Sequence, residues 1–288
     1  MATLREIRRR ITSIRSTQQI TKAMKMVAAA KLRRAQENLM ATRPYAEKLC
    51  ETMAHLMARM EYRTSPLLIE RPVERVLLVV ITADRGLCGA FNSNLIRYAS
   101  NVIRSSTDME TQLFTIGRKG YEYFTKRDYE INGQKINFFN HLNFADALEV
   151  SSHLRKAYET AQFDKIEIVY HEFKSAVQQR IVTEQFLPFQ PDEQMLSESS
   201  QIDFLYEPDK QTILPALISR VLNVELWKVL LESNASEQGA RMTSMESATD
   251  NAEDLIDTLT LFYNRARQGA ITKEISEIVG GAEALKEK

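Results

Sequence analysis

The sequence predicts an α/β domain placed between two long terminal helices that pair as an antiparallel coiled coil. Three observations predict this class. Apolar residues recur at alternating steps of three and four along each end of the chain, which is the spacing of a coiled-coil seam. Between the two ends, the pattern changes to short apolar runs that alternate with stretches of helical spacing. This change is typical of a layered α/β domain.

The C-terminal region, 208–288, is expected to form a single helix. It contains no proline after Pro215, and Gly239 is its only glycine before Gly269. At 1.5 Å per residue such a helix would be roughly 115 Å long, which exceeds the depth of any core that a chain of this size can build. It therefore needs a partner helix. Its predicted seam consists of Leu214, Leu217, Val221, Val224, Lys228, Leu231, Ala235, Gln238, Met242, Met245, Thr249, Ala252, Ile256, Leu259, Tyr263, Ala266 and Ala270.

The partner helix is expected at the opposite end of the chain, within 1–64. Pro44 interrupts the pattern, but the apolar register continues beyond it, so a kink is expected rather than a break. The predicted seam consists of Leu4, Ile7, Ile11, Ile14, Gln18, Thr21, Lys25, Ala28, Leu32, Ala35, Leu39, Thr42, Ala46, Leu49, Met53, Leu56 and Met60.

Residues 1–60 are expected to pair antiparallel with the C-terminal helix, because one domain connects the two. If the helices start level near Met60 and Asp209, the N-terminal helix runs out opposite about Asn264. This leaves 268–288 without a partner helix. The same register places the basic stretch Arg8–Arg15 beside the acidic stretch Glu253–Asp257.

The central region, 73–207, is expected to form a Rossmann-like α/β domain. Arg75–Thr82 is apolar without alternation and is rich in β-branched residues, which predicts a buried parallel strand. Asn92 or Ser93 is a candidate N-cap for the helix that follows. Further strands are predicted at Gln112–Ile116, Lys135–Phe139, Lys165–Tyr170 and Gln179–Phe186, and helices at Asn92–Ser105, Gly120–Lys126 and Ala145–Ala161.

Composition argues against several classes of function. The 38 basic residues balance the 38 acidic ones, so no overall charge favours nucleic acid or a membrane surface. The longest apolar run, Val76–Ile81, is too short to cross a bilayer, and no direct membrane insertion is expected. Cys50 and Cys88 form no C-x-x-C pair, which favours a reducing compartment.

No catalytic residue, metal site or cofactor is predicted. The four histidines are scattered without the spacing of metal ligands. The segment Asp84–Gly89 follows a strand and opens a helix, where backbone amides can hold a phosphate. It lacks the glycine pattern of nucleotide-binding loops, so a structural turn is the favoured interpretation.

Several motifs together identify a family. They are Ile20–Lys31 (ITKAMKMVAAAK), Arg43–Tyr45 (RPY), Thr82–Gly89 (TADRGLCG), Leu205–Pro208 (LYEP), and Ala248–Asn251 (ATDN) continuing to Arg267–Thr272 (RQGAIT). In this combination the chain resembles, nearly end to end, the gamma subunit of F-type rotary ATP synthases. It lacks the cysteine-containing insertion of the chloroplast form and a mitochondrial presequence, so the resemblance is to the bacterial gamma subunit.

The resemblance implies a central rotor shaft, present in one copy per complex and without catalytic activity of its own. Such a shaft couples proton-driven rotation of the c-ring to ATP synthesis or hydrolysis in the beta subunits. The implied partners are the alpha, beta and epsilon subunits and the c-ring, with no nucleic acid. The implied location is peripheral, on the cytoplasmic face of the bacterial cell membrane. The residues implied to contact beta are Met24, Arg241, Arg267, Gln268, Thr272 and Glu277, and those implied to form the foot on the c-ring and epsilon are Tyr206 and Glu207.

Two other functions remain open from the residues alone. One is a coiled-coil structural adaptor, which would self-associate as a homodimer. The other is a nucleotide-binding α/β enzyme that uses Asp84–Gly89 and carries the coiled coil as an arm.

Overall fold

The computed structural model describes residues 3–57, 65–106, 109–139, 142–190, 207 and 209–286. The chain forms two compact units, one of Met1–Val27 with Met242–Lys288 and the other of Ala28–Arg241. Each unit contains part of the two terminal helices, α1 (Leu4–Met57) and α6 (Lys210–Lys286). The domain boundaries expected from the sequence, at 1–64, 73–207 and 208–288, follow the change of pattern along the chain and remain a prediction.

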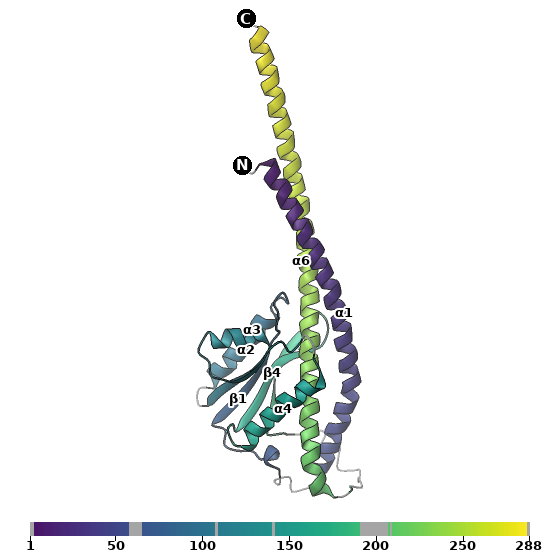
Figure 1. Cartoon of the computed structure of the whole chain (residues 1–288), viewed down its shortest axis with the longest axis vertical. Helices are drawn as coiled ribbons and strands as arrows, with labels where there is room; N and C mark the ends of the chain where they lie inside the picture. The colour runs from purple at the N-terminus through teal and green to yellow at the C-terminus, as the bar shows by residue number, and fades with distance from the viewer. Residues whose placement is uncertain are drawn as a thin grey trace. The chain divides into compact units, whose positions relative to one another are not determined.

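The larger unit is built on a five-stranded sheet in the order β3-β2-β1-β4-β5 (Figure 1). The first four strands run parallel, and β5 pairs antiparallel with β4. Their bounds are β1 Arg75–Ile81, β2 Glu110–Ile116, β3 Ile131–Lys135, β4 Lys165–Phe173 and β5 Gln179–Leu187. The α/β class and the two strands predicted at Lys165–Tyr170 and Gln179–Phe186 are therefore confirmed.

Both faces of the sheet are covered, which explains the continuous apolar run of β1. On one face, α2 (Phe91–Ser105) and α3 (Arg118–Thr125) pack Leu95 and Phe124 against Leu78 and Val80. On the other face lie α4 (Phe144–Glu159) and the parts of α1 and α6 that belong to this unit. A short 3₁₀ helix, η2 (Pro66–Leu68), contributes Leu67 to this second core.

Within this unit, α6 is buried on more than its seam. Leu222, Leu226 and Leu230 enter the core beside the sheet. Further along the helix, polar side chains that the heptad pattern would place outside the seam, including Glu232 and Glu237, are also buried. The reason is that α6 contacts the α/β domain as well as α1, so it needs a wider buried surface than a two-stranded coiled coil.

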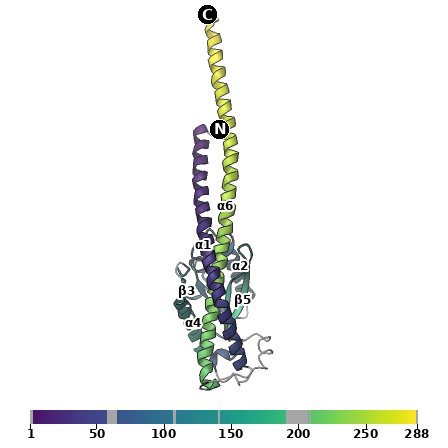
Figure 2. The same cartoon turned by 90° about the vertical axis from the view of Figure 1, so that its right-hand side faces the viewer.

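The smaller unit is an antiparallel pair of helices, with α1 and α6 side by side (Figure 2). Its buried seam includes Ile7, Thr21, Met245, Ala252 and Ile256, all of which the heptad spacing predicted. The cross-helix contacts of Thr21 with Thr249 and of Lys25 with Glu246 fix the register. This register is about two residues further along α6 than a level start at Met60 and Asp209 predicts. Met60 itself lies outside the described residues.

Two local predictions were wrong: the bounds of the third strand and the N-cap of the helix that follows β1. The third strand is Ile131–Lys135 rather than Lys135–Phe139, because Asn137 adopts a positive φ of 59° and its N–H turns toward Asp84. Helix α2 begins at Phe91, and Asn92 accepts a hydrogen bond from Ala83 N instead of capping the helix. Ser93 likewise does not act as the N-cap, which is Ala90.

Candidate functional site

The end of α6 carries four of the residues that the resemblance singles out, Arg267, Gln268, Thr272 and Glu277. Every side chain from Arg267 to Ala282 is exposed. The exposed side chains include Ile271, Ile275, Ile278 and Val279, with exposed fractions of 48%, 56%, 65% and 55%. An exposed apolar stripe on a helix that has no partner helix is typical of a surface that another protein covers.

Contacts within this stretch are local to the helix. Thr272 Oγ1 donates to the carbonyl oxygen of Gln268 at 2.9 Å. Lys273 Nζ lies 3.7 Å from Glu277 Oε1, and both side chains are largely exposed, so this pair contributes little to stability. The polar groups of this stretch are therefore available to an incoming surface.

Met24 lies on α1 in the smaller unit, half-buried beside the polar part of the seam. There the hydroxyl oxygens of Thr21 and Thr249 are 2.8 Å apart, and Lys25 Nζ is 2.6 Å from Glu246 Oε1. Polar pairs inside a coiled-coil seam lower stability but favour one register over its neighbours.

The basic and acidic stretches that the predicted register places side by side do not form ion pairs with each other. No ion pair joins Arg8–Arg15 to Glu253–Asp257, although the structure describes all of these residues. Among the described residues, the ion pair that joins the two helices in this unit is instead the one between Lys25 and Glu246. Lys22, Asp250 and Glu253 line the groove beside that pair.

Arg241, the remaining predicted contact residue, lies in the larger unit and is bound within the chain. Its guanidinium donates to Glu237 Oε1 at 2.6 Å and to the carbonyl oxygens of Gly86 at 3.2 Å and Arg85 at 3.5 Å. Both side chains of the ion pair are nearly buried. Burial raises the pKa of Glu237, and the charge of Arg241 partly offsets that rise. Arg241 thus connects α6 to the turn Asp84–Gly89.

Glu237 was not among the residues predicted from the sequence. The spacing of four residues between Glu237 and Arg241 is the one that brings two side chains together on a helix, and it could have indicated the pair. Its burial could not be read from the sequence, because it depends on the α/β domain packing against that face of α6.

The turn Asp84–Gly89 is a structural turn, as favoured from the sequence. The carboxylate of Asp84 accepts backbone hydrogen bonds from Arg118 N, Asn137 N and Phe139 N at 3.1, 2.7 and 3.1 Å. It thereby joins the segments that follow β1, β2 and β3. A carboxylate at this edge of the sheet also repels phosphate, which disfavours the nucleotide-binding alternative.

Other residues with reactive side chains have structural environments. His171 is buried, stacks on Phe91 with ring centroids 4.2 Å apart, and its Nε2 lies 2.9 Å from Phe91 O. Burial lowers its pKa. Within the described ranges, no three His, Cys, Asp or Glu side chains gather as a metal site requires.

Of the two residues predicted to form the foot, one lies within the described residues. Tyr206 lies outside the described residues, and Glu207 is exposed in a bend before α6. None of the helices in the described part of the chain combines the length and apolarity needed to cross a membrane.

Fold and site together define a class of protein in which two terminal helices pair antiparallel and an α/β domain lies between them in the sequence. The C-terminal helix of this class ends in an exposed apolar stripe. A family model described as ATP synthase matches residues 3–285. The chain belongs to this family, in its gamma-chain branch.

Relatives named ATP synthase gamma chain match over almost the entire length. The one from Chloroherpeton thalassium is 47% identical over 302 residues, covering 100% of this chain and 99% of the relative. Those from Cytophaga hutchinsonii and Geobacter sp. are 47% and 46% identical, covering 99% of this chain in each case and 99% and 100% of the relatives.

Solved structures agree. A chain in the central stalk and c-ring structure of Tetrahymena thermophila mitochondrial ATP synthase is 25% identical, with a TM-score of 0.61, covering 80% of this chain and 99% of that chain. A chain in the Euglena gracilis mitochondrial ATP synthase is 24% identical, with a TM-score of 0.70 and coverage of 98% and 94%. The second likeness supports the fold.

Proposed function

We propose that this chain is the central rotor shaft of a proton-translocating F-type ATP synthase. It couples rotation of the c-ring, driven by the proton gradient, to ATP synthesis or hydrolysis in the beta subunits. The observation that carries the proposal is the full-length match to bacterial gamma chains, together with an α6 whose side chains are exposed over Arg267–Ala282.

The mechanism needs no covalent chemistry in this chain, and we assign it no catalytic residue and no cofactor. A shaft that contacts three otherwise equivalent catalytic sites at different angles stabilises a different conformation of each site. Turning the shaft then moves the three sites through their conformations in sequence.

The contacts with beta are assigned to Met24, Arg241, Arg267, Gln268, Thr272 and Glu277. Arg267, Gln268, Thr272 and Glu277 are exposed side chains beside an apolar stripe, which fits a bearing that combines apolar contact with directional hydrogen bonds. Arg241 would have to exchange its bonds to the turn Asp84–Gly89 for bonds to beta, so it is assigned to a contact that forms at particular angles only.

The other end of the shaft is assigned to Tyr206 and Glu207, which would form the foot on the c-ring and the epsilon subunit. The alpha and beta subunits would surround the paired helices, and one copy of the chain would serve each complex. In this proposal the chain is a peripheral subunit on the cytoplasmic face of the cell membrane.

Co-purification with counted subunits tests this function. A tag on this chain should retrieve alpha, beta, epsilon and c subunits, with one copy of the chain for three alpha and three beta, by native mass spectrometry. A homodimer without other subunits would favour the structural adaptor. Stoichiometric ATP binding by the isolated chain, lost in Gly86→Val, would favour the nucleotide-binding enzyme.

A further inference from the structure

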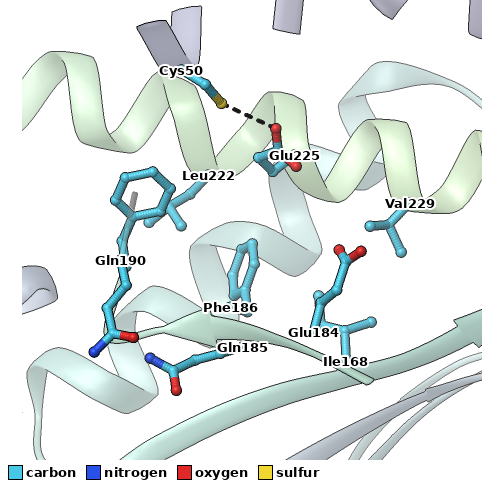
Figure 3. Close-up of a pocket in the computed structure, with 10 residues that line it drawn as sticks. Cys50, Ile168, Glu184, Gln185, Phe186, Gln190, Leu222, Glu225 and Val229 are labelled. Carbon is cyan, nitrogen blue, oxygen red and sulfur yellow. Dashed lines mark hydrogen bonds between the residues drawn. The ribbon is translucent and has the colours of Figure 1, made fainter. Parts of the chain in front are cut away.

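A cavity of about 430 Å³ opens in the larger unit between β5, α6 and α1 (Figure 3). Its floor is apolar and buried, formed by Ile168, Phe186, Leu222 and Val229. Its rim is polar and more exposed, with Glu184 and Glu225 as its two charged lining residues. The volume lies within the usual range for sites that bind small molecules.

The two carboxylates come from opposite walls. Figure 3 shows Glu184 rising from β5 and Glu225 descending from α6, with the ring of Phe186 below Glu225. Glu225 is partly neutralised, since it accepts hydrogen bonds from Lys228 Nζ at 3.2 Å and from Cys50 Sγ at 3.2 Å. The cavity therefore presents an apolar floor under an anionic rim.

The negative charge of Glu184 is less neutralised by neighbouring groups than that of Glu225. It accepts a hydrogen bond from Tyr170 OH at 2.7 Å, and it takes part in no ion pair within the part of the chain that the structure describes. Tyr170 stays a neutral donor, because burial raises its pKa. One lysine thus faces two glutamates, which leaves the cavity with an excess of negative charge.

We propose that this cavity binds a small amphipathic cation, with an ammonium group between Glu184 and Glu225 and a short alkyl chain on Phe186, Leu222 and Val229. The carboxylates favour a cation over a neutral or anionic ligand of the same shape. The floor favours an alkyl chain, since each methylene group that leaves water adds to affinity. The inference concerns this chain alone and does not depend on the rotor function.

The test uses the full chain and three probes of equal length: hexylammonium, hexanol and hexanoate. Methyl NMR signals of Ile168, Leu222 and Val229 are followed during each titration. Hexylammonium should shift these signals saturably and bind about threefold to fivefold more tightly than hexanol, since partly exposed ion pairs contribute this much. Hexanoate should bind more weakly than both.

Two variants distinguish the contribution of the carboxylate charge to affinity from that of the apolar cavity. Glu184→Gln should lower the affinity for hexylammonium to that for hexanol while leaving hexanol binding unchanged, which also shows that the cavity is intact. Glu159→Gln, an exposed glutamate on α4, is the matched control and should bind hexylammonium as the parent does. Equal binding of hexylammonium and hexanol, no effect of Glu184→Gln, or no saturable shift would overturn the proposal.

Discussion

The hydroxyl oxygens of Thr21 and Thr249 lie 2.8 Å apart across the interface of α1 and α6. Thr21 is buried, and Thr249 is half-buried one turn from the Lys25–Glu246 ion pair. A shift of register would separate the hydroxyls and break the ion pair together. These two contacts therefore define the pairing of the smaller unit.

The first prediction concerns this register. In the double variant Thr21→Cys with Thr249→Cys, the two sulfur atoms would occupy the positions of the hydroxyl oxygens, close enough for a disulfide. Mild oxidation should produce a near-complete intramolecular cross-link, measured by mobility on a non-reducing gel and by peptide mass. Thr21→Cys with Thr260→Cys, displaced by about three turns along α6, should not cross-link. Similar yields in the two variants would contradict the register.

The second prediction concerns the exposed end of α6. A chain that stops before Arg267 loses a stretch whose described side chains, Arg267–Ala282, are all exposed, so its thermal unfolding midpoint should stay within about 2 °C of the parent by circular dichroism. In the assembled complex, however, ATP-driven proton pumping should fall strongly. A chain that stops after Val279 is the control and should keep most pumping. Undiminished pumping by the shorter chain would refute the role of this end as a bearing.

The third prediction concerns the buried pair Glu237 and Arg241. Arg241→Ala leaves a buried carboxylate without its counter-ion, and the free energy of unfolding at pH 7 should fall by about 3 kcal/mol in urea titrations. The double variant Glu237→Gln with Arg241→Ala removes the buried charge as well and should recover much of that loss.

The same pair predicts a pH dependence. Burial raises the pKa of Glu237 above its ordinary 4.5. A carboxyl group whose pKa rises on folding binds its proton more tightly in the folded state, so stability falls as pH rises from 4.5 through the raised pKa. Without Arg241 the pKa of Glu237 is raised further, so the stability deficit of Arg241→Ala should grow as pH rises from the raised pKa of the parent to the higher pKa of the variant. A deficit that is constant with pH would show that Arg241 acts through packing alone.

The fourth prediction concerns Cys50. Burial, with a further contribution from Glu225, raises the pKa of its thiol to about 12. In a Cys88→Ser background, Cys50 should react slowly with Ellman's reagent at pH 8, and its rate should increase with pH up to about 12, because the thiolate is the reactive form. Glu225→Gln should speed the reaction at pH 8. Glu51→Gln is the control and should not, because the charge of Glu51 is already paired with Lys48. Equal rates in the two variants would argue against the influence of Glu225.

The fifth prediction concerns Gly117, which has a φ of 93°. A Cβ atom there would lie 1.9 Å from the carbonyl oxygen of Thr82, so Gly117→Ala should destabilise the chain by about 3 kcal/mol or more. Gly86→Ala meets no atom within 4 Å and serves as the control, with an expected change of less than about 1 kcal/mol. Differential scanning calorimetry of the two variants checks the contrast.

Much of the fold could be predicted from periodicity alone. Ile7, Ala28, Leu39 and Met53 are buried as their heptad positions require, and β1 is buried on both faces as its continuous apolar run indicates. These patterns work because each is a repeat along one element, and burial follows from the geometry of that element. The third strand could not be placed, since Asn137 and Phe139 bond to Asp84, which is distant in sequence.

By itself, the sequence determined the paired terminal helices, the α/β class of the domain and the unpartnered end of α6, because helix and strand periodicity and helix length are local properties. Only the tertiary structure decided the register of the helix pair and the burial of Glu237. It also decided the hydrogen bonds of Arg241 to the turn Asp84–Gly89 and the cavity with Glu184 and Glu225 at its rim. Each of these depends on side chains from separate elements meeting in space, and no spacing along one element encodes the offset at which two elements pack.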